Sequence, residues 1–203
     1  MVVSDQSGIY PSVYYPSYIS TVCRQIPGFT SEEFLTELDR LAQKCVYIIE
    51  IGCFKGRSTA VLANAVVGVV YAIDIWYTPM YDPSVLLGDG NHFDECLAYR
   101  VFWQNMRRMG VDRKIVPMIG NSHWMDRYFK PESIDLIFID GDHAEHMVLQ
   151  DIQLYLPKLR KGGVMCGDDY DLESVKRPVD AMARINGFEV VTFADGKGWR
   201  YTR

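Results

Sequence analysis

Apolar residues follow two spacings along this chain, and the two spacings alternate. Short runs rich in Val, Ile and aromatic residues are typical of strands buried in a parallel sheet. Between them, apolar residues recur every three or four positions, as in helices that pack by one face. The predicted strands are residues 46–51, 69–74, 114–120, 134–140 and 164–167, and the predicted helices are residues 30–42, 58–65, 92–109, 143–156 and 175–185.

The C-terminal residues predict a closing antiparallel hairpin, with strands at 188–193 and 199–202 around a turn at 195–198. Pro117 weakens the third strand and favours an edge position for it. Strands and helices that alternate in this way predict an α/β fold. We expect a Rossmann-like, doubly wound sandwich with a mostly parallel seven-stranded sheet and the C-terminal antiparallel hairpin.

The length of 203 residues suits one well-buried domain, which we place at residues 26–203. Residues 1–25 show no clear period and carry four tyrosines among prolines and serines. We interpret them as a tyrosine-rich arm that packs on the domain, on a partner subunit or over the substrate pocket. Residues 75–91 form a long polar and aromatic connection, and loops of this length are usually lids or binding loops.

Composition narrows the class of protein. A net charge of −5 argues against a nucleic acid or an anionic membrane as partner. Arg107, Arg108 and Arg113 are interpreted as a solvated helix end, because no aromatic residues are interleaved with them. No apolar run approaches the roughly 20 residues that span a bilayer, and the N-terminus lacks the order of a secretory signal, so a cytoplasmic protein is expected.

The five cysteines include no CxxC pair, which fits reduced thiols better than a disulfide or zinc framework. Cys53 is the cysteine nearest to a predicted ligand-binding turn. A nucleophilic role for it would require a partner that activates the thiol.

That turn joins the first predicted strand to a helix. Gly52 and Gly56 allow a sharp bend and a close approach to a ligand, and the helix that begins near Ser58 presents N–H groups that favour an anion. Asp74 follows 22 positions after Gly52, where such folds place an acid on ribose hydroxyls. The GxGxxG fingerprint is not present, since three residues including Phe54 separate the two glycines, and this disfavours a bound pyrophosphate.

Polar side chains collect at the carboxyl ends of the predicted strands, where open parallel sheets bind ligands. The stretches EIGCFKGRST, IDIW, GNSH, FIDGDH and LRKGGVMCGDDY occur in this order. Together they resemble the class I S-adenosylmethionine-dependent methyltransferases over roughly residues 26–170. The resemblance is closest to the metal-dependent O-methyltransferase branch, in which DGDH precedes a late DD or DN pair, as in the catechol, caffeoyl-CoA and macrocin O-methyltransferases.

The resemblance implies roles for individual residues. The residues that would surround S-adenosylmethionine are Glu50, Gly52, Phe54, Gly56, Ser58, Asp74, Ile75, Trp76, Asn121, Ser122, His123 and Asp140. The first five would line its methionine portion, with Ser58 at the carboxylate. Asp74 would hold the ribose, Ile75 and Trp76 would lie beside the adenine, and residues 121–123 would close over the adenine edge. A divalent ion, usually magnesium, would be bound by Asp140, Asp168 and Asp169.

Electrostatics support the ion independently of the resemblance. The fourth and fifth strands are neighbours in this topology, so Asp140, Asp168 and Asp169 should converge, and without a cation they would repel each other. Hard oxygen ligands suit Mg²⁺, Mn²⁺ or Ca²⁺ and argue against zinc. The alternative is a group of hydrogen-bonded strand ends with no ion. Asp169 stands where the catechol type has asparagine, which favours the sugar-modifying type.

Asp142 and His143 are the candidates for the catalytic base. The resemblance to the sugar enzymes suggests Asp142. With Glu145, however, Asp142 also forms the D-x-x-E pattern of a helix cap, so it is a base, a cap, or each at different times. His143 is a base or an orienting residue. Asp151, like His146, is assigned to the helix surface.

The expected function is therefore S-adenosylmethionine-dependent transfer of a methyl group, assisted by a divalent metal, to a hydroxyl of a small molecule. Adjacent hydroxyls, as in a sugar, a catechol or a natural product, would let the acceptor chelate the ion. Two alternatives are a non-catalytic cofactor-binding protein and a cephalosporin-hydroxylase-like oxidoreductase on the same fold. A homodimer is compatible with the aromatic arm, and neither a nucleic acid nor a membrane is expected as a partner.

Overall fold

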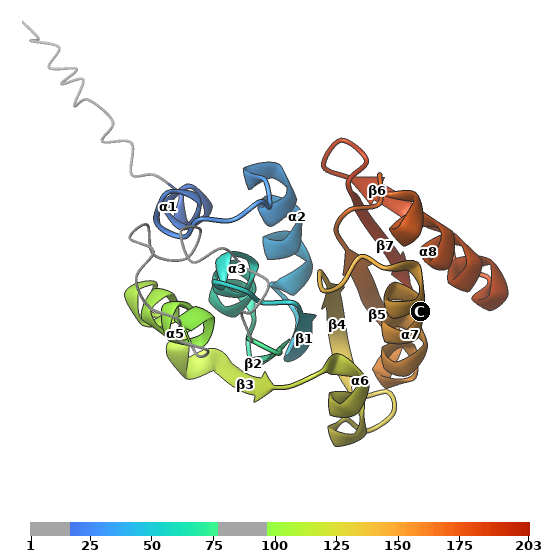
Figure 1. Cartoon of the computed structure of the whole chain (residues 1–203), viewed down its shortest axis with the longest axis horizontal. Helices are drawn as coiled ribbons and strands as arrows, with labels where there is room; N and C mark the ends of the chain where they lie inside the picture. The colour runs from blue at the N-terminus through green and yellow to red at the C-terminus, as the bar shows by residue number, and fades with distance from the viewer. Residues whose placement is uncertain (1–16, 77–96) are drawn as a thin grey trace, which may run out of the picture.

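The computed structural model describes residues 17–76 and 97–203, and within them seven strands form one sheet. The strands are β1 (Tyr47–Ile51), β2 (Val69–Asp74), β3 (Ile115–Ile119), β4 (Ile134–Ile139), β5 (Leu159–Gly167), β6 (Val191–Phe193) and β7 (Gly198–Thr202). Their order is β3-β2-β1-β4-β5-β7-β6, and β7 runs antiparallel to both of its neighbours (Figure 1). This confirms the predicted doubly wound sheet with its C-terminal hairpin, and the strand order reverses between β1 and β4.

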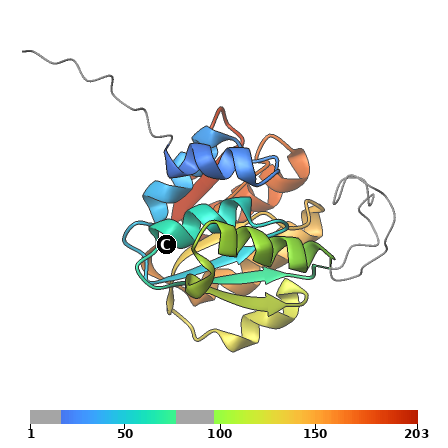
Figure 2. The ribbon, with the colours of Figure 1, turned by 90° about the vertical axis from the view of Figure 1, so that its left-hand side faces the viewer.

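Helices cover both faces of the sheet. Those in the described part of the chain are α1 (Tyr18–Gln25), α2 (Glu32–Ala42), α3 (Arg57–Ala65), α5 (Leu97–Arg108), α6 (Ser122–Met125), α7 (Glu145–Tyr155) and α8 (Glu173–Asn186). One core lies beneath α1, α2, α3 and α5, and a second lies beneath α7 and α8. Figure 2 looks onto the first face, where α1, α3 and α5 lie in front of the strands.

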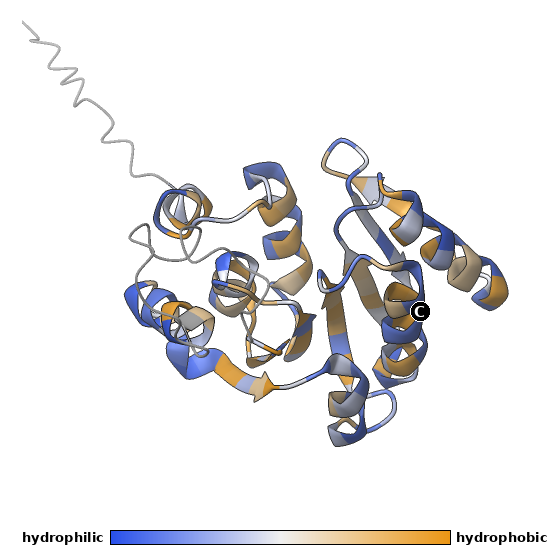
Figure 3. Cartoon of the chain, viewed as in Figure 1, coloured by the Kyte–Doolittle hydropathy of each residue, from blue (hydrophilic) through white to orange (hydrophobic). Residues whose placement is uncertain are grey.

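Alternate residues of the central strand β1 enter opposite cores. Ile48 packs beneath the α2 and α3 face, whereas Ile49 and Ile51 pack beneath the α7 face. Since both faces are covered, Glu50 is buried together with its apolar neighbours. Figure 3 shows hydrophobic colour on strand β4, whereas helices α5, α7 and α8 carry both hydrophilic and hydrophobic colour. A carboxylate buried in the central strand needs a local explanation, which the site supplies.

The part of the expected arm that the structure describes is helix α1. Ser17 caps it by accepting a hydrogen bond from the Ser20 N–H, and α1 contacts both α2 and α3. Val22 of α1 is fully buried, and it belongs to the same core as the buried residues of α2 and α3. From Tyr18 onward, the segment expected as an arm is thus a helix of the domain, and residues 1–16 lie outside the described part.

Several element boundaries differ from the prediction. Strand β5 begins at Leu159 rather than at residue 164, because the chain passes through Gly162 at φ 73° with a register shift against β4 instead of turning into the strand there. Helix α7 begins at Glu145, two residues later than expected. The edge position expected from Pro117 is confirmed, since β3 ends the strand order and, within the described part of the chain, pairs only with β2. The expected start of the 92–109 helix and the 77–91 connection lie outside the described residues.

No helix in residues 17–76 and 97–203 is long and apolar enough to cross a membrane.

Candidate functional site

Backbone hydrogen bonds continue past the ends of the central strands and join their carboxyl ends. The Gly52 N–H donates to the Ile73 carbonyl at 2.9 Å, and the Asp140 N–H donates to the Ile51 carbonyl at 2.8 Å. These bonds bring the turns after β1, β2 and β4 together at the point where the strand order reverses. In open α/β sheets this is the position of the ligand crevice.

Both predicted glycines of the turn after β1 are required by its geometry. Gly52 has φ 86°, and a Cβ there would lie 2.0 Å from the Asp140 carbonyl oxygen. Gly56 also has φ 86°, and its Cβ would lie 2.3 Å from the Met106 side chain on α5. Gly56 also begins helix α3 as its N-cap. The turn therefore folds tightly against its surroundings and aims the helix N-terminus at the crevice.

Asp74 closes this turn through its carboxylate. One oxygen accepts from the N–H groups of Cys53 and Phe54, each at 2.8 Å, and the other accepts from the Trp76 N–H at 2.7 Å. A carboxylate offers about four acceptor positions, so these three bonds leave room for a ribose hydroxyl. The residue expected to hold the ribose is thus first a structural clamp on the cofactor turn.

Trp76 and Ile75, which were expected beside the adenine, have different surroundings. Trp76 is 3% exposed, and its indole N–H donates to the Phe54 carbonyl at 2.9 Å while its ring packs against Tyr99 and Phe102. Ile75 is 54% exposed. The Trp76 ring therefore supports the turn from within the core. Ile75 is the residue of the two that has accessible apolar surface.

Glu50 and Ser58 form a buried pair beneath the turn. The Ser58 hydroxyl donates to Glu50 Oε1, whereas Glu50 Oε2 has no hydrogen-bond partner among the residues that the structure describes. Burial raises the pKa of Glu50 to about 7, and the Ser58 hydrogen bond offsets part of that rise. The unpartnered oxygen is the kind of acceptor that a ligand ammonium group would satisfy.

Cys53 does not have the surroundings of a nucleophile. Its thiol is buried, and burial together with the charge of Glu50 raises its pKa well above the usual value. No basic side chain partners the thiol among the described residues, where its contacts are the carbonyls of Glu50 and Ile73. The described cysteines 23, 45, 53 and 166 are all free thiols, as expected.

The segment expected over the adenine edge, Asn121 to His123, turns its side chains inward. Asn121 accepts a hydrogen bond from the His123 N–H at 2.9 Å and so caps α6. The Ser122 hydroxyl donates to Asp151 at 2.7 Å, and His123 Nε2 lies 3.4 Å from the same carboxylate oxygen. Contacts of this segment with a cofactor would therefore come mainly from its backbone.

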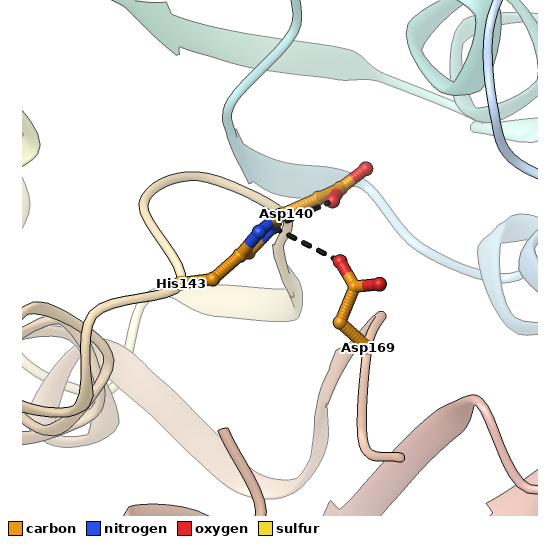
Figure 4. A group of neighbouring side chains, drawn as sticks. All are labelled: Asp140, His143 and Asp169. Atoms are coloured by element: carbon orange, nitrogen blue, oxygen red, sulfur yellow. Dashed lines mark ion pairs between the residues drawn. The ribbon is translucent and has the colours of Figure 1, made fainter. Parts of the chain in front are cut away.

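Three donor atoms gather at the carboxyl ends of β4 and β5. His143 Nε2 lies 2.9 Å from Asp169 Oδ2 and 3.9 Å from Asp140 Oδ1, and the three side chains point toward one another (Figure 4). The contacts with Asp140 and Asp169 raise the pKa of His143 to about 10, so the imidazole is a cation at neutral pH. The same ion pair lowers the pKa of Asp169, whereas burial raises that of Asp140.

Asp168 and Asp142 lie beside this group and make different contacts. Asp168 Oδ1 accepts from the Asp169 N–H at 2.8 Å, and burial together with the charge of Asp140 raises its pKa to about 7. Asp142 is exposed and accepts from the N–H of Ala144, the N-cap residue of α7, at 2.8 Å. Asp142 therefore stabilises the turn before α7 without being the N-cap itself.

The donor set fits a divalent cation. Two carboxylate oxygens and one imidazole nitrogen, from Asp140, Asp169 and His143, all lie within 4.8 Å of one another. Hard divalent cations prefer carboxylate oxygens, and a cation that also bound Nε2 would displace the proton of His143. Of the three expected ligands, Asp140 and Asp169 belong to the group, while Asp168 lies at its margin with one oxygen directed to backbone.

Sequence reasoning missed two residues. Asp151 was assigned to the helix surface, but it is 2% exposed, so that assignment is wrong. Its spacing from Val148 and Tyr155, which are also buried, would have placed it on the inner face of α7. The approach of His143 to Asp169 carries no sequence signal, since the two are brought together by the pairing of β4 with β5.

The sequence of this chain resembles that of a curated protein. An uncharacterized protein of Acanthamoeba polyphaga mimivirus is 28% identical to this chain over 127 residues, which is 60% of this chain and 50% of that protein. The chain thus spans about half the length of this curated relative.

Solved structures share the fold. The cofactor-bound protein Rv0187 from MTB superposes with a TM-score of 0.68 at 19% identity, covering 95% of this chain and 92% of that one. The O-methyltransferase from Bacillus cereus in complex with SAH gives a TM-score of 0.63 at 16% identity, covering 95% of this chain and 94% of that one. At these identities the likeness establishes the fold.

A family model described as a methyltransferase domain matches residues 49–170. That span runs from strand β1 to the residue after Asp169, so it contains the glycine turn, the Asp74 clamp and the acidic group. The resemblance inferred from the sequence motifs is confirmed at this level, and the chain belongs to this family of methyltransferase domains.

Proposed function

We propose that this methyltransferase transfers the methyl group of S-adenosylmethionine to a hydroxyl oxygen of a small molecule with adjacent hydroxyls, assisted by a divalent cation. The observation that carries the proposal is the contact between the two turns. The backbone of Gly52, in the expected cofactor turn, abuts Asp140, in the acidic group, so closely that no Cβ would fit between them. A cofactor over the first turn would therefore present its methyl group next to the acidic side chains.

S-adenosylmethionine is supported as the methyl donor by features of the turn. The N-terminus of α3 suits the cofactor carboxylate, and the buried, unpartnered oxygen of Glu50 suits its ammonium group. Asp74 keeps acceptor capacity for the ribose. The family match and the SAH-bound structure of the same fold favour this reading over the oxidoreductase alternative.

The acidic group would hold the cation through Asp140 and Asp169, with Asp168 and His143 beside them. When bound, a divalent cation lowers the pKa of a coordinated hydroxyl and so makes its oxygen a better nucleophile. The balanced reaction forms one bond from the acceptor oxygen to the methyl carbon, breaks the bond from that carbon to sulfur, and releases the hydroxyl proton to a base.

Asp142 is the residue that we assign as this base. His143 Nε2 is engaged with Asp169 Oδ2 at 2.9 Å, beside the place where the cation would bind, so it is less available to take the acceptor proton. Asp142 is exposed at the same loop and directs one oxygen to the Ala144 N–H, which leaves the other to accept a proton. A turn-stabilising role and a base role are therefore compatible in one carboxylate.

The test replaces Asp168 and Asp169 together by alanine. Transfer to a panel of catechols and glycosides should fall at least about 100-fold, because the cation would lose its ligands. Affinity for S-adenosylhomocysteine, measured by calorimetry, should stay within about threefold, because the cofactor turn is untouched. Asp171→Ala, at an exposed neighbouring position, is the matched control and should keep full activity.

Full activity of the double variant in the presence of a chelator would contradict the metal-assisted mechanism. Failure of the wild-type protein to bind S-adenosylhomocysteine would contradict the choice of methyl donor. The two results are separate, so each part of the proposal can fail alone.

A further inference from the structure

A buried carboxylate lies on the inner face of helix α7, away from the acidic group. Asp151 is 2% exposed, and its polar contacts are with the Ser122 hydroxyl, at 2.7 Å, and His123 Nε2, at 3.4 Å. Burial raises its pKa, and these two contacts offset part of that effect. A carboxylate buried in this way is costly unless hydrogen bonds compensate it, and a satisfied network of this kind makes the segments that it joins more rigid.

A second side chain of α7 reaches the same segment. The Tyr155 hydroxyl donates to the Ser122 carbonyl at 2.7 Å, and the Tyr155 ring is fully buried. Helix α7 therefore contacts Ser122 twice, through Asp151 at the Ser122 hydroxyl and through Tyr155 at the Ser122 carbonyl. The residues it holds follow β3 directly and belong to the segment that we expect along the cofactor.

Helix α7 also begins at the acidic group. Its N-cap residue, Ala144, donates its N–H to Asp142, and its first residue is Glu145. One rigid helix thus carries the base loop at its N-terminus and, about two turns further on, the two residues that hold the 121–123 segment. Helix α7 therefore fixes the distance between the 121–123 segment and the base loop.

We propose that Asp151 and Tyr155 are positioning residues, which hold the Asn121 to His123 segment of the cofactor site against helix α7. They touch neither cofactor nor acceptor, and they act through Ser122 and His123. This inference rests on the proposed binding of S-adenosylmethionine at that segment.

The experiment compares four variants of the full chain. Tyr155→Phe removes one hydroxyl and keeps the ring, and Asp151→Ala removes the carboxylate. Asp151→Asn keeps an oxygen that can accept from Ser122. Tyr201→Phe is the matched control, because Tyr201 is also buried but donates its hydroxyl to Met165 Sδ of strand β5, at 3.2 Å, and not to the 121–123 segment. Each is measured for S-adenosylhomocysteine affinity, for Tm, and for amide hydrogen exchange of residues 121–125 without ligand.

Tyr155→Phe should weaken the affinity roughly fivefold and Asp151→Ala at least about tenfold, with faster exchange across residues 121–125. Asp151→Asn should restore affinity to within about threefold of wild type. Tyr201→Phe should lower Tm while leaving affinity and this exchange unchanged.

Wild-type affinity in Tyr155→Phe and Asp151→Ala, with only Tm reduced, would overturn the inference and show a purely structural network. An equal loss of affinity in Tyr201→Phe would overturn it as well. A wild-type protein that binds no S-adenosylhomocysteine would instead overturn the proposed function, and the inference with it, so the two failures are distinguishable.

Discussion

The two halves of the site are stabilised in opposite ways. The cofactor half, from Glu50 to Trp76, is held by burial and by hydrogen bonds from backbone N–H groups to Asp74. The acidic half is held by charge, since an imidazolium lies between two carboxylates. Its side chains keep more solvent contact, with His143 47% exposed and Asp169 32% exposed.

Substitutions in the two halves should therefore have different effects on stability, affinity and activity. In the buried half, a side chain that binds the ligand also holds the turn, so a change should alter stability and affinity together. In the acidic half, the paired side chains of His143 and Asp169 are partly exposed, and exposed ion pairs contribute little to stability. There, chemistry should change while the fold does not.

The largest expected effect is on catalysis by the acidic half. Asp142→Asn keeps an oxygen for the Ala144 N–H but cannot accept a proton at neutral pH. We expect kcat to fall by roughly 100-fold or more, with Tm unchanged. Steady-state kinetics with thermal denaturation measure both. Retained activity in Asp142→Asn would show that Asp142 serves only the turn, and Asp171→Asn is the exposed control.

The next effect couples stability to affinity in the buried half. Asp74→Ala removes the acceptor of three backbone N–H groups and should lower the free energy of unfolding by about 2 kcal/mol. Affinity for S-adenosylhomocysteine should fall at least about tenfold in the same variant. Asp74→Asn keeps one acceptor oxygen, so its stability and its affinity should lie between those of wild type and those of Asp74→Ala. Urea denaturation and calorimetry test the coupling, and a loss of affinity with unchanged stability would break the contrast between the halves.

The third effect depends on pH. The pKa of Glu50 is raised from 4.5 to about 7 in the folded protein, so its contribution to stability is complete below pH 4.5 and declines as pH rises through 7. Glu50→Gln should therefore nearly match wild type near pH 4.5 and be more stable by about 3 kcal/mol at pH 8.5. Urea denaturation of the ligand-free protein at both pH values measures this. Glu33→Gln, on the exposed surface of α2, should show no such pH dependence. A constant difference between Glu50→Gln and wild type at both pH values would contradict the assigned cause.

Local sequence signals predicted the central strands and most of the helices, because apolar periodicity reports burial directly. Helix α1 was missed, although Ile19, Val22 and Cys23, followed by Ile26 at its C-cap, recur at helical spacing. The start of β5 was missed because a glycine pair is read locally as a turn, whereas pairing with β4 keeps those residues in the sheet.

For the site, the sequence by itself determined which polar residues stand at the strand ends and that a turn with Gly52 and Gly56 follows the first strand. These are properties of neighbours along the chain. Only the tertiary structure decided that Asp74 clamps the turn, that His143 lies between Asp140 and Asp169, and that Asp151 is buried against Ser122. The physical reason is that strand pairing and helix packing bring together residues far apart in sequence, and the identity of a side chain does not record which partner its hydrogen bonds will find.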